Sequence, residues 1–179
     1  MPTTFTRRDF LTTSAAGAAC LATRPAFAQA TDPTDLTIAE AQRLVRRGDL
    51  SPVDLVEAYT ARIRRLDARL NAFVTVTEER ALERARALEA ELAGGRWRGP
   101  LHGIPIGLKD NIDTAGVRTT AGSAVYADRV PDEDAEMVTR LEAAGAIVLG
   151  KLNLHEFAYG GTSAFTLSGP VRNPWDTDR

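Results

Sequence analysis

The stretch AEMVTRLEAAGAIVLGKLNLHEFAYG, residues 135–160, decides the fold class. Apolar residues first recur at helical spacing, which predicts a helix over 132–144. They then run together as Ala146-Ile147-Val148-Leu149-Gly150, which predicts a buried strand, and a short helix is expected over 153–158. This alternation of helix and strand favours an α/β fold whose sheet has mainly parallel strands.

Upstream, the sequence carries start and stop signals of helices. Thr37 followed by Glu40 forms a capping box, Gly48 marks a helix end, and Pro52 stands at a favoured first helical position. The elements expected here are a helix over 38–47, a second over 52–70, a strand over 71–76 and a third helix from 77 to the glycines at 94 and 95. A helical N-terminal part therefore precedes the α/β part.

Between these parts, glycines and prolines become frequent and short apolar runs alternate with polar turns. LHGIPIGL at 101–108 and IDTAG at 112–116 are interpreted as two short strands. The turn that joins them contains Lys109, Asp110 and Asn111, and we expect it to be functional.

The first 30 residues, MPTTFTRRDFLTTSAAGAACLATRPAFAQA, are typical of an export signal. The start is basic, the middle is rich in alanine, and Ala26-Phe27-Ala28 resembles a cleavage site, so we expect cleavage after Ala28. The segment TRRDFL at 6–11 resembles the twin-arginine motif, which indicates a periplasmic or secreted protein.

Composition excludes several classes of protein. The chain has 179 residues, 44% of them hydrophobic and 26% charged, with a formal net charge of −2. These values are typical of one globular domain and argue against disorder, collagen and binding to nucleic acid phosphates. The sequence has no apolar run of the roughly 18 residues that span a membrane. Cys20 is the single cysteine and lies in the expected signal, so the mature chain has no thiol for a disulfide, a zinc site or a nucleophile.

The two lysines stand out because the other cations are arginines: of 22 basic residues, only Lys109 and Lys151 are Lys. Arginine keeps its proton, whereas a lysine can lose one when it is buried. Lys109 follows an apolar run, so we expect apolar walls and a neutral amine that accepts a proton or attacks a carbonyl. The structural alternative is an ion pair with Asp110. For Lys151, donation to loop carbonyls is at least as well supported as a chemical role.

Other candidate constellations are weaker. His102, Asp110, Asp113, His155 and Glu156 lack the compact spacing of a metal motif, and no metal or other cofactor is expected. Neither Ser123 nor Ser163 lies in a nucleophile elbow. His102, between Leu and Gly, is typical of a structural histidine.

Three blocks, GPLHGIPIGLKDNIDTAGVRTTAGS (99–123), residues 135–160 and SGPVRNPWDTDR (168–179), resemble consecutive blocks of the amidase signature family. The resemblance implies N-terminal helices leading into an α/β/α sandwich around a mixed sheet. It also implies hydrolysis of peptide or non-peptide C–N amide bonds by a serine, a second serine in a cis peptide, and a lysine, which here is Lys109. The expected partner is a small-molecule amide. Family members that supply ammonia for glutaminyl-tRNA synthesis are disfavoured, because charged tRNA is not exported.

In the family, the N-P-W-D block runs into a P-G-G-S-S-G-G-S segment with the cis serine, and a later D-T-G-G-S segment holds the nucleophile. Neither segment occurs in the 179 residues. We therefore expect residues 1–28 to be a signal and 29–179 to be the N-terminal part of an amidase signature domain. This part is truncated before the segments that contain the serines, so we expect it to be inactive alone. Two alternatives are an exported non-catalytic binding module derived from this region, and a different lysine enzyme that forms a Schiff base through Lys109.

Overall fold

The computed structural model describes residues 32–178, so the expected signal over 1–28 lies outside the described residues. The α-helices are α2 (Ile38–Arg47), α3 (Pro52–Leu70), α4 (Glu78–Ala93) and α5 (Glu136–Ala143), the strands are β1 (Phe73–Val76), β2 (Pro105–Lys109) and β3 (Ile147–Leu152), and the 3-10 turns are η2 (Pro33–Asp35), η3 (Ala124–Tyr126) and η4 (Glu156–Ala158). Within this part of the chain, no helix combines the length and apolar character that crossing a bilayer would require.

The N-terminal helices begin and end as predicted. The Thr37 side chain accepts from the Glu40 amide, and the Glu40 carboxylate accepts from the Thr37 amide at 2.8 Å, so the capping box is confirmed. Gly48 ends α2 in the left-handed region, at φ 77°. Ser51 caps α3, whose first helical residue is Pro52.

The sheet is mixed and has the order β1-β3-β2. Strand β3 lies in the centre, antiparallel to β1 and parallel to β2. The expected mixed sheet is thus confirmed, and the parallel relation predicted from the helix–strand alternation holds for the β2–β3 pair.

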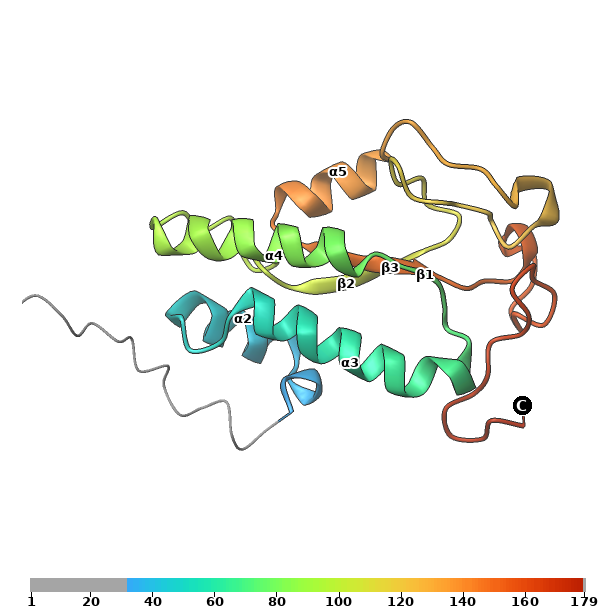
Figure 1. The fold of residues 1–179 in the computed structure, drawn as a ribbon, viewed down its shortest axis with the longest axis horizontal. Helices are drawn as coiled ribbons and strands as arrows, with labels where there is room; N and C mark the ends of the chain where they lie inside the picture. The colour runs from blue at the N-terminus through green and yellow to red at the C-terminus, as the bar shows by residue number, and fades with distance from the viewer. Residues whose placement is uncertain (1–31, 179) are drawn as a thin grey trace, which may run out of the picture.

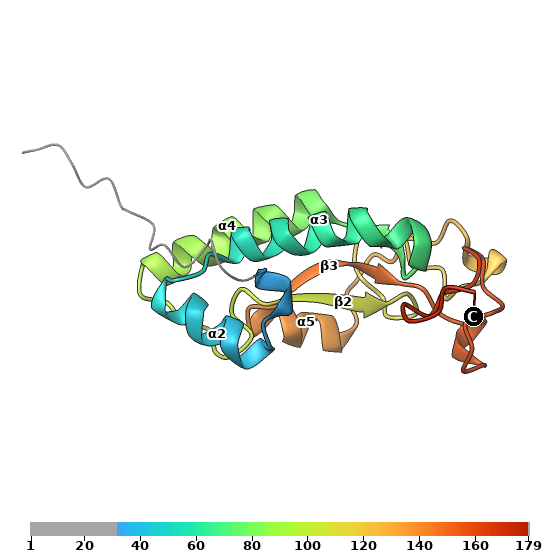
Figure 2. The same ribbon diagram turned by 90° about the horizontal axis from the view of Figure 1, so that it is seen from below.

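Helices cover both faces of this sheet (Figures 1 and 2). Figure 2 shows α3 and α4 along one face of the strands and α5 on the other. On the first face, Val56 of α3 and Leu88 of α4 pack with Ile147 of β3. On the second, Val138 of α5 packs with Leu108 and Val148. The successive residues Ile147 and Val148 point to opposite faces, which explains why β3 is a continuous apolar run.

Four expected elements differ from the structure. The strand expected over 101–108 is β2, which begins at Pro105 because residues 101–103 form a turn, and Lys109 ends this strand rather than lying in the turn after it. Residues 112–116 form a loop rather than a strand, because the Ile112 carbonyl and the Thr114 hydroxyl turn inward and accept hydrogen bonds from the buried amine of Lys151. Helix α5 begins at Glu136 rather than near 132, since Asp134 accepts from the Ala115 amide at 2.7 Å. The helix expected over 153–158 is only the turn η4, whose Phe157 has a φ of 50°.

We expect Gly150→Ala to separate β1 from β3. A Cβ at Gly150 would lie 2.1 Å from the Thr75 carbonyl oxygen, and backbone cannot rotate away as a side chain can. Overpacking costs about 1–3 kcal/mol, and this backbone clash should lie at the upper end. Urea unfolding checks the loss against Gly161→Ala, where a Cβ would meet nothing within 4 Å. Equal stability of the two variants would contradict the prediction.

Candidate active site

Lys109 is the last residue of β2 and pairs in register with Leu152 of β3. Its side chain is exposed, while the preceding Leu108 is buried against α5. The expectation that apolar walls enclose Lys109 is therefore wrong for the described residues. Alternation along a strand turns one residue into the core and the next away from it, so an apolar run before a lysine does not bury the lysine.

The residue after Lys109 is buried and held by the loop that returns beside it. Asp110 Oδ2 accepts from the Thr120 amide at 2.9 Å and from the Thr120 hydroxyl at 2.5 Å. Its amide donates to the Leu152 carbonyl at 2.9 Å, and its carbonyl accepts from the Ala121 amide at 2.9 Å. Asp110 thus bonds to Thr120, instead of forming the ion pair with Lys109 that was the structural alternative.

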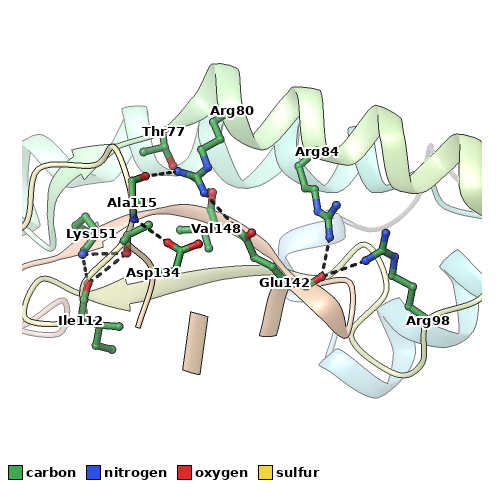
Figure 3. Close-up of polar contacts among 11 residues, drawn as sticks. Thr77, Arg80, Arg84, Arg98, Ile112, Ala115, Asp134, Glu142, Val148 and Lys151 are labelled. Atoms are coloured by element: carbon green, nitrogen blue, oxygen red, sulfur yellow. Dashed lines mark hydrogen bonds and ion pairs between the residues drawn. The ribbon is translucent and has the colours of Figure 1, made fainter. Parts of the chain in front are cut away.

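Lys151 is the buried lysine of the pair, with 0% of its surface exposed. It lies within β3, and its Nζ donates to the Ile112 carbonyl, to Thr119 Oγ1 at 2.8 Å and to Thr114 Oγ1 at 3.2 Å. Figure 3 shows the amine directed at this loop. Burial lowers the pKa of Lys151, and the carboxylates of Asp110 and Asp113 oppose that shift.

Donation of Lys151 to a loop carbonyl, one of the two expected roles, is confirmed for Ile112, but sequence reasoning missed which residues supply the oxygens and that two of them are hydroxyls. Ile112, Thr114 and Thr119 carry no spacing signal, because they converge only when the loop folds over β3. The sequence offers one clue, which is that a lysine stands where the chain otherwise uses arginine.

Of the other candidates, His102 is structural, as predicted. It is fully buried, its Nδ1 accepts from the Arg98 amide at 3.3 Å, and its Nε2 lies 3.0 Å from the Leu88 carbonyl oxygen. Ser123 is also buried, and its hydroxyl donates to Glu156 at 2.5 Å. Within residues 32–178, no three His, Cys, Asp or Glu side chains are grouped so that they could hold a metal.

Segments far apart in sequence meet at the carboxyl ends of β2 and β3 (Figures 1 and 2). Lys109, the last residue of β2, lies at this end of the sheet. The Phe157 amide donates to the Ala121 carbonyl at 2.8 Å, and the Leu167 amide donates to the Gly122 carbonyl at 2.7 Å. Asp113 forms two hydrogen bonds with Arg129, at 2.6 and 2.7 Å, and Arg129 holds the pKa of that carboxyl below its usual range. This end of the sheet is therefore built from the loops that follow each strand.

Three arginines bond to residues at the C-terminal end of α5 (Figure 3). Arg84 donates to the Glu142 carbonyl at 2.6 Å, and Arg98 donates to the Ala143 carbonyl at 3.4 Å. Arg80 bridges the Glu142 carboxylate at 3.3 Å and the Ala115 carbonyl at 2.9 Å. Cations at a helix C-terminus complement its dipole and satisfy its last carbonyls, so this cluster is structural.

The ion pair between Glu91 and Arg98 should make stability depend on pH. Hydrogen bonds from Arg98, at 2.5 and 2.6 Å, lower the pKa of Glu91 to about 2 from 4.5. Because the folded pKa is the lower one, the stabilisation is present above about pH 4.5 and is lost as the pH falls towards 2. We expect the difference in unfolding free energy between wild type and Glu91→Gln to shrink over that range. Urea unfolding at several pH values checks this, with the exposed Glu79→Gln as control, and a constant difference would refute it.

The family described as Amidase matches residues 54–179. A glutamyl-tRNA(Gln) amidotransferase subunit from Salinispora arenicola is 44% identical over 149 residues, which are 83% of this chain and 30% of that protein. The corresponding subunit from Moorella thermoacetica is 47% identical over 144 residues, 80% of this chain and 30% of that protein. The chain thus spans less than a third of the length of these relatives.

Solved structures agree on the fold. The peptide amidase of Stenotrophomonas maltophilia superposes with a TM-score of 0.74 at 40% identity, covering 80% of this chain and 31% of that one. A bacterial aryl acylamidase of the amidase signature enzymes superposes with a TM-score of 0.73 at 29% identity, covering 80% of this chain and 30% of the other.

Proposed function

The chain belongs to the amidase signature family, and on this premise we propose that the protein that carries it hydrolyses a carboxylic amide through an acyl-enzyme. The observation that carries the proposal is Lys109 in its block, GIPIGLKD, at the exposed end of β2 with its backbone fixed by neighbouring residues. Proton transfer requires a group held in position, and the fixed backbone of Lys109 supplies part of that positioning.

In the proposed mechanism, Lys109 acts on a pair of serines that the 179 residues do not include. The neutral amine takes a proton, relayed by the cis serine, from the nucleophilic serine, whose oxygen bonds to the amide carbon. The C–N bond then breaks, and the resulting ammonium of Lys109 returns the proton to the leaving amine. Water hydrolyses the acyl-enzyme in a second cycle of the same proton transfers.

The test is expression of the complete open reading frame that encodes this chain, beside residues 1–179 alone. Ammonia or amine release is measured on a panel of alkyl, aryl and peptide amides, and hydroxylamine is added to trap the acyl group as a hydroxamate. We expect hydrolysis by the product of the complete frame and none by residues 1–179, because a base without nucleophile and oxyanion donors stabilises no tetrahedral intermediate. If the product of the complete reading frame hydrolyses none of the amides, the proposal is wrong and a non-catalytic module is favoured.

A second candidate is a component of a tRNA-dependent amidotransferase, which the names of the curated relatives favour. Location separates the two, since the tRNA reaction belongs to the cytoplasm. We propose an exported amidase, on the strength of Arg7-Arg8 and the site after Ala28. Cell fractionation checks this: the wild-type protein should reach the periplasm or medium, and the Arg7→Lys/Arg8→Lys variant should stay inside. Cytoplasmic wild-type protein would favour the amidotransferase.

A further inference from the structure

The oxygens around Lys151 are arranged to accept protons. The Thr114 hydroxyl donates its single proton to the Ile112 carbonyl at 3.2 Å, and the Thr119 hydroxyl donates to the Val117 carbonyl at 3.0 Å. Each hydroxyl therefore presents lone pairs to Nζ. With the Ile112 carbonyl, these oxygens give three acceptors for the three N–H groups of an ammonium.

This arrangement explains why position 151 is a lysine in a chain that otherwise uses arginine. An ammonium is compact and its three donors rotate to fit, whereas a guanidinium is planar and carries five donors. Lys151 is fully buried, so a guanidinium there would leave donors without partners and lack space.

The loop that bonds to Lys151 also bonds to Lys109 and to its neighbour Asp110. Thr119, an acceptor of the ammonium, is followed by Thr120, whose amide and hydroxyl both bond to Asp110. At the start of the loop, the Ile112 amide donates to the Lys109 carbonyl at 3.0 Å. One end of the loop thus bonds to Lys109 and the other end to its neighbour Asp110, and Lys151 fastens both ends to β3 through Ile112, Thr114 and Thr119.

Charge adds a second link between the two lysines. Asp110 is fully buried, and its Oδ1 has no hydrogen-bond partner among the described residues. The Asp110 carboxylate and the Lys151 ammonium attract each other electrostatically. A buried carboxylate is costly without a nearby cation, so loss of Lys151 would favour opening of the loop and release of Asp110.

We propose that Lys151 is a positioning residue for Lys109: its ammonium closes the 112–119 loop, and the closed loop fixes the backbone from which Lys109 acts. The inference rests on the proposed function for the meaning of Lys109 as a base. The coupling between the two lysines does not depend on that function, because it comes from the hydrogen bonds of the loop and from the attraction between Lys151 and Asp110.

The experiment uses the fact that the chain has two lysines. Labelling with ¹⁵N-lysine gives backbone amide signals from Lys109 and Lys151 alone, and relaxation gives the order parameter of Lys109. We expect about 0.85 in the wild-type chain and below about 0.6 in Lys151→Met. Thr119→Val keeps the shape but removes one acceptor of Lys151 and the bond to the Val117 carbonyl, and it should give an intermediate value. Thr119→Ser keeps the hydroxyl and should restore rigidity.

Arg98→Met is the matched control, because it removes the ion pair with Glu91 and the bonds to the Glu142 and Ala143 carbonyls, none of which lies in the 112–119 loop. It should lower stability and leave Lys109 rigid. Rigid Lys109 in folded Lys151→Met, or equal loosening in Arg98→Met, would overturn the inference. If Lys151→Met does not fold, the Thr119→Val and Thr119→Ser pair decides by the same criterion. The readout is motion rather than turnover, so an inactive protein would refute the proposed function without touching this result.

Discussion

Lys109→Arg is expected to lower kcat/KM for amide hydrolysis by about 10²–10⁴-fold, the contribution of positioned proton transfer. Arginine keeps the charge and much of the length of lysine but does not give up its proton at any working pH. In the 179-residue chain Lys109 is exposed at the end of β2, so the larger head group should not disturb the packing of this part of the fold. The loss would therefore report chemistry rather than stability.

The measurement is kcat/KM of the product of the complete reading frame from pH 6 to 10, with folding checked by circular dichroism. Lys109→Met is the matched variant, because it removes both the charge and the base. If Lys109 is a base, both variants lose activity equally. If Lys109 is only a cation, Lys109→Arg keeps more than about a tenth of the wild-type activity while Lys109→Met does not, and the assignment is wrong.

The helical part of the fold was predictable because its signals are local. The Thr37–Glu40 box and Gly48 set the ends of α2 within a few residues of chain. The buried strand over 146–150 was predictable for a similar reason, since a short apolar run bounded by glycines fits few other structures.

The site was harder to predict, because burial there depends on register. Lys151 pairs with Leu108 across β2 and β3, and a register shift between Ile106 and Gly107 lies just before this pair. Such a bulge has no signature in the apolar pattern, yet it helps to set which side chains share a face. The sequence analysis expected burial for Lys109, whereas Lys151 is the buried lysine of the two.

The strand expected over 112–116 is wrong for a related reason. Ile112 and Thr114 have the alternation and β-branching of a strand. Tertiary contacts often override the intrinsic strand propensity of a short segment. Here the buried Lys151 ammonium donates to the Ile112 carbonyl and to the Thr114 hydroxyl. A residue 37 positions away in sequence thus decides the local structure.

Lys151→Met is expected to lower the free energy of unfolding by about 2–4 kcal/mol. Methionine fills much of the volume but donates nothing, so the Thr114 and Thr119 hydroxyls lose their donor in a dry site, and each buried unsatisfied group costs about 1–3 kcal/mol. The buried Asp110 carboxylate also loses its nearby cation. Lys151→Arg should cost about 1–3 kcal/mol through overpacking, although it keeps the charge.

Urea unfolding of the 179-residue chain measures both losses, and Arg140→Met on α5 supplies the control. The Arg140 and Glu136 side chains are 78% and 73% exposed, so breaking their ion pair should change stability by less than about 0.5 kcal/mol. If Lys151→Met falls within that same range, water must reach Thr114 and Thr119 in the folded chain. The ammonium would then not be what holds the loop, because solvent could satisfy the same oxygens.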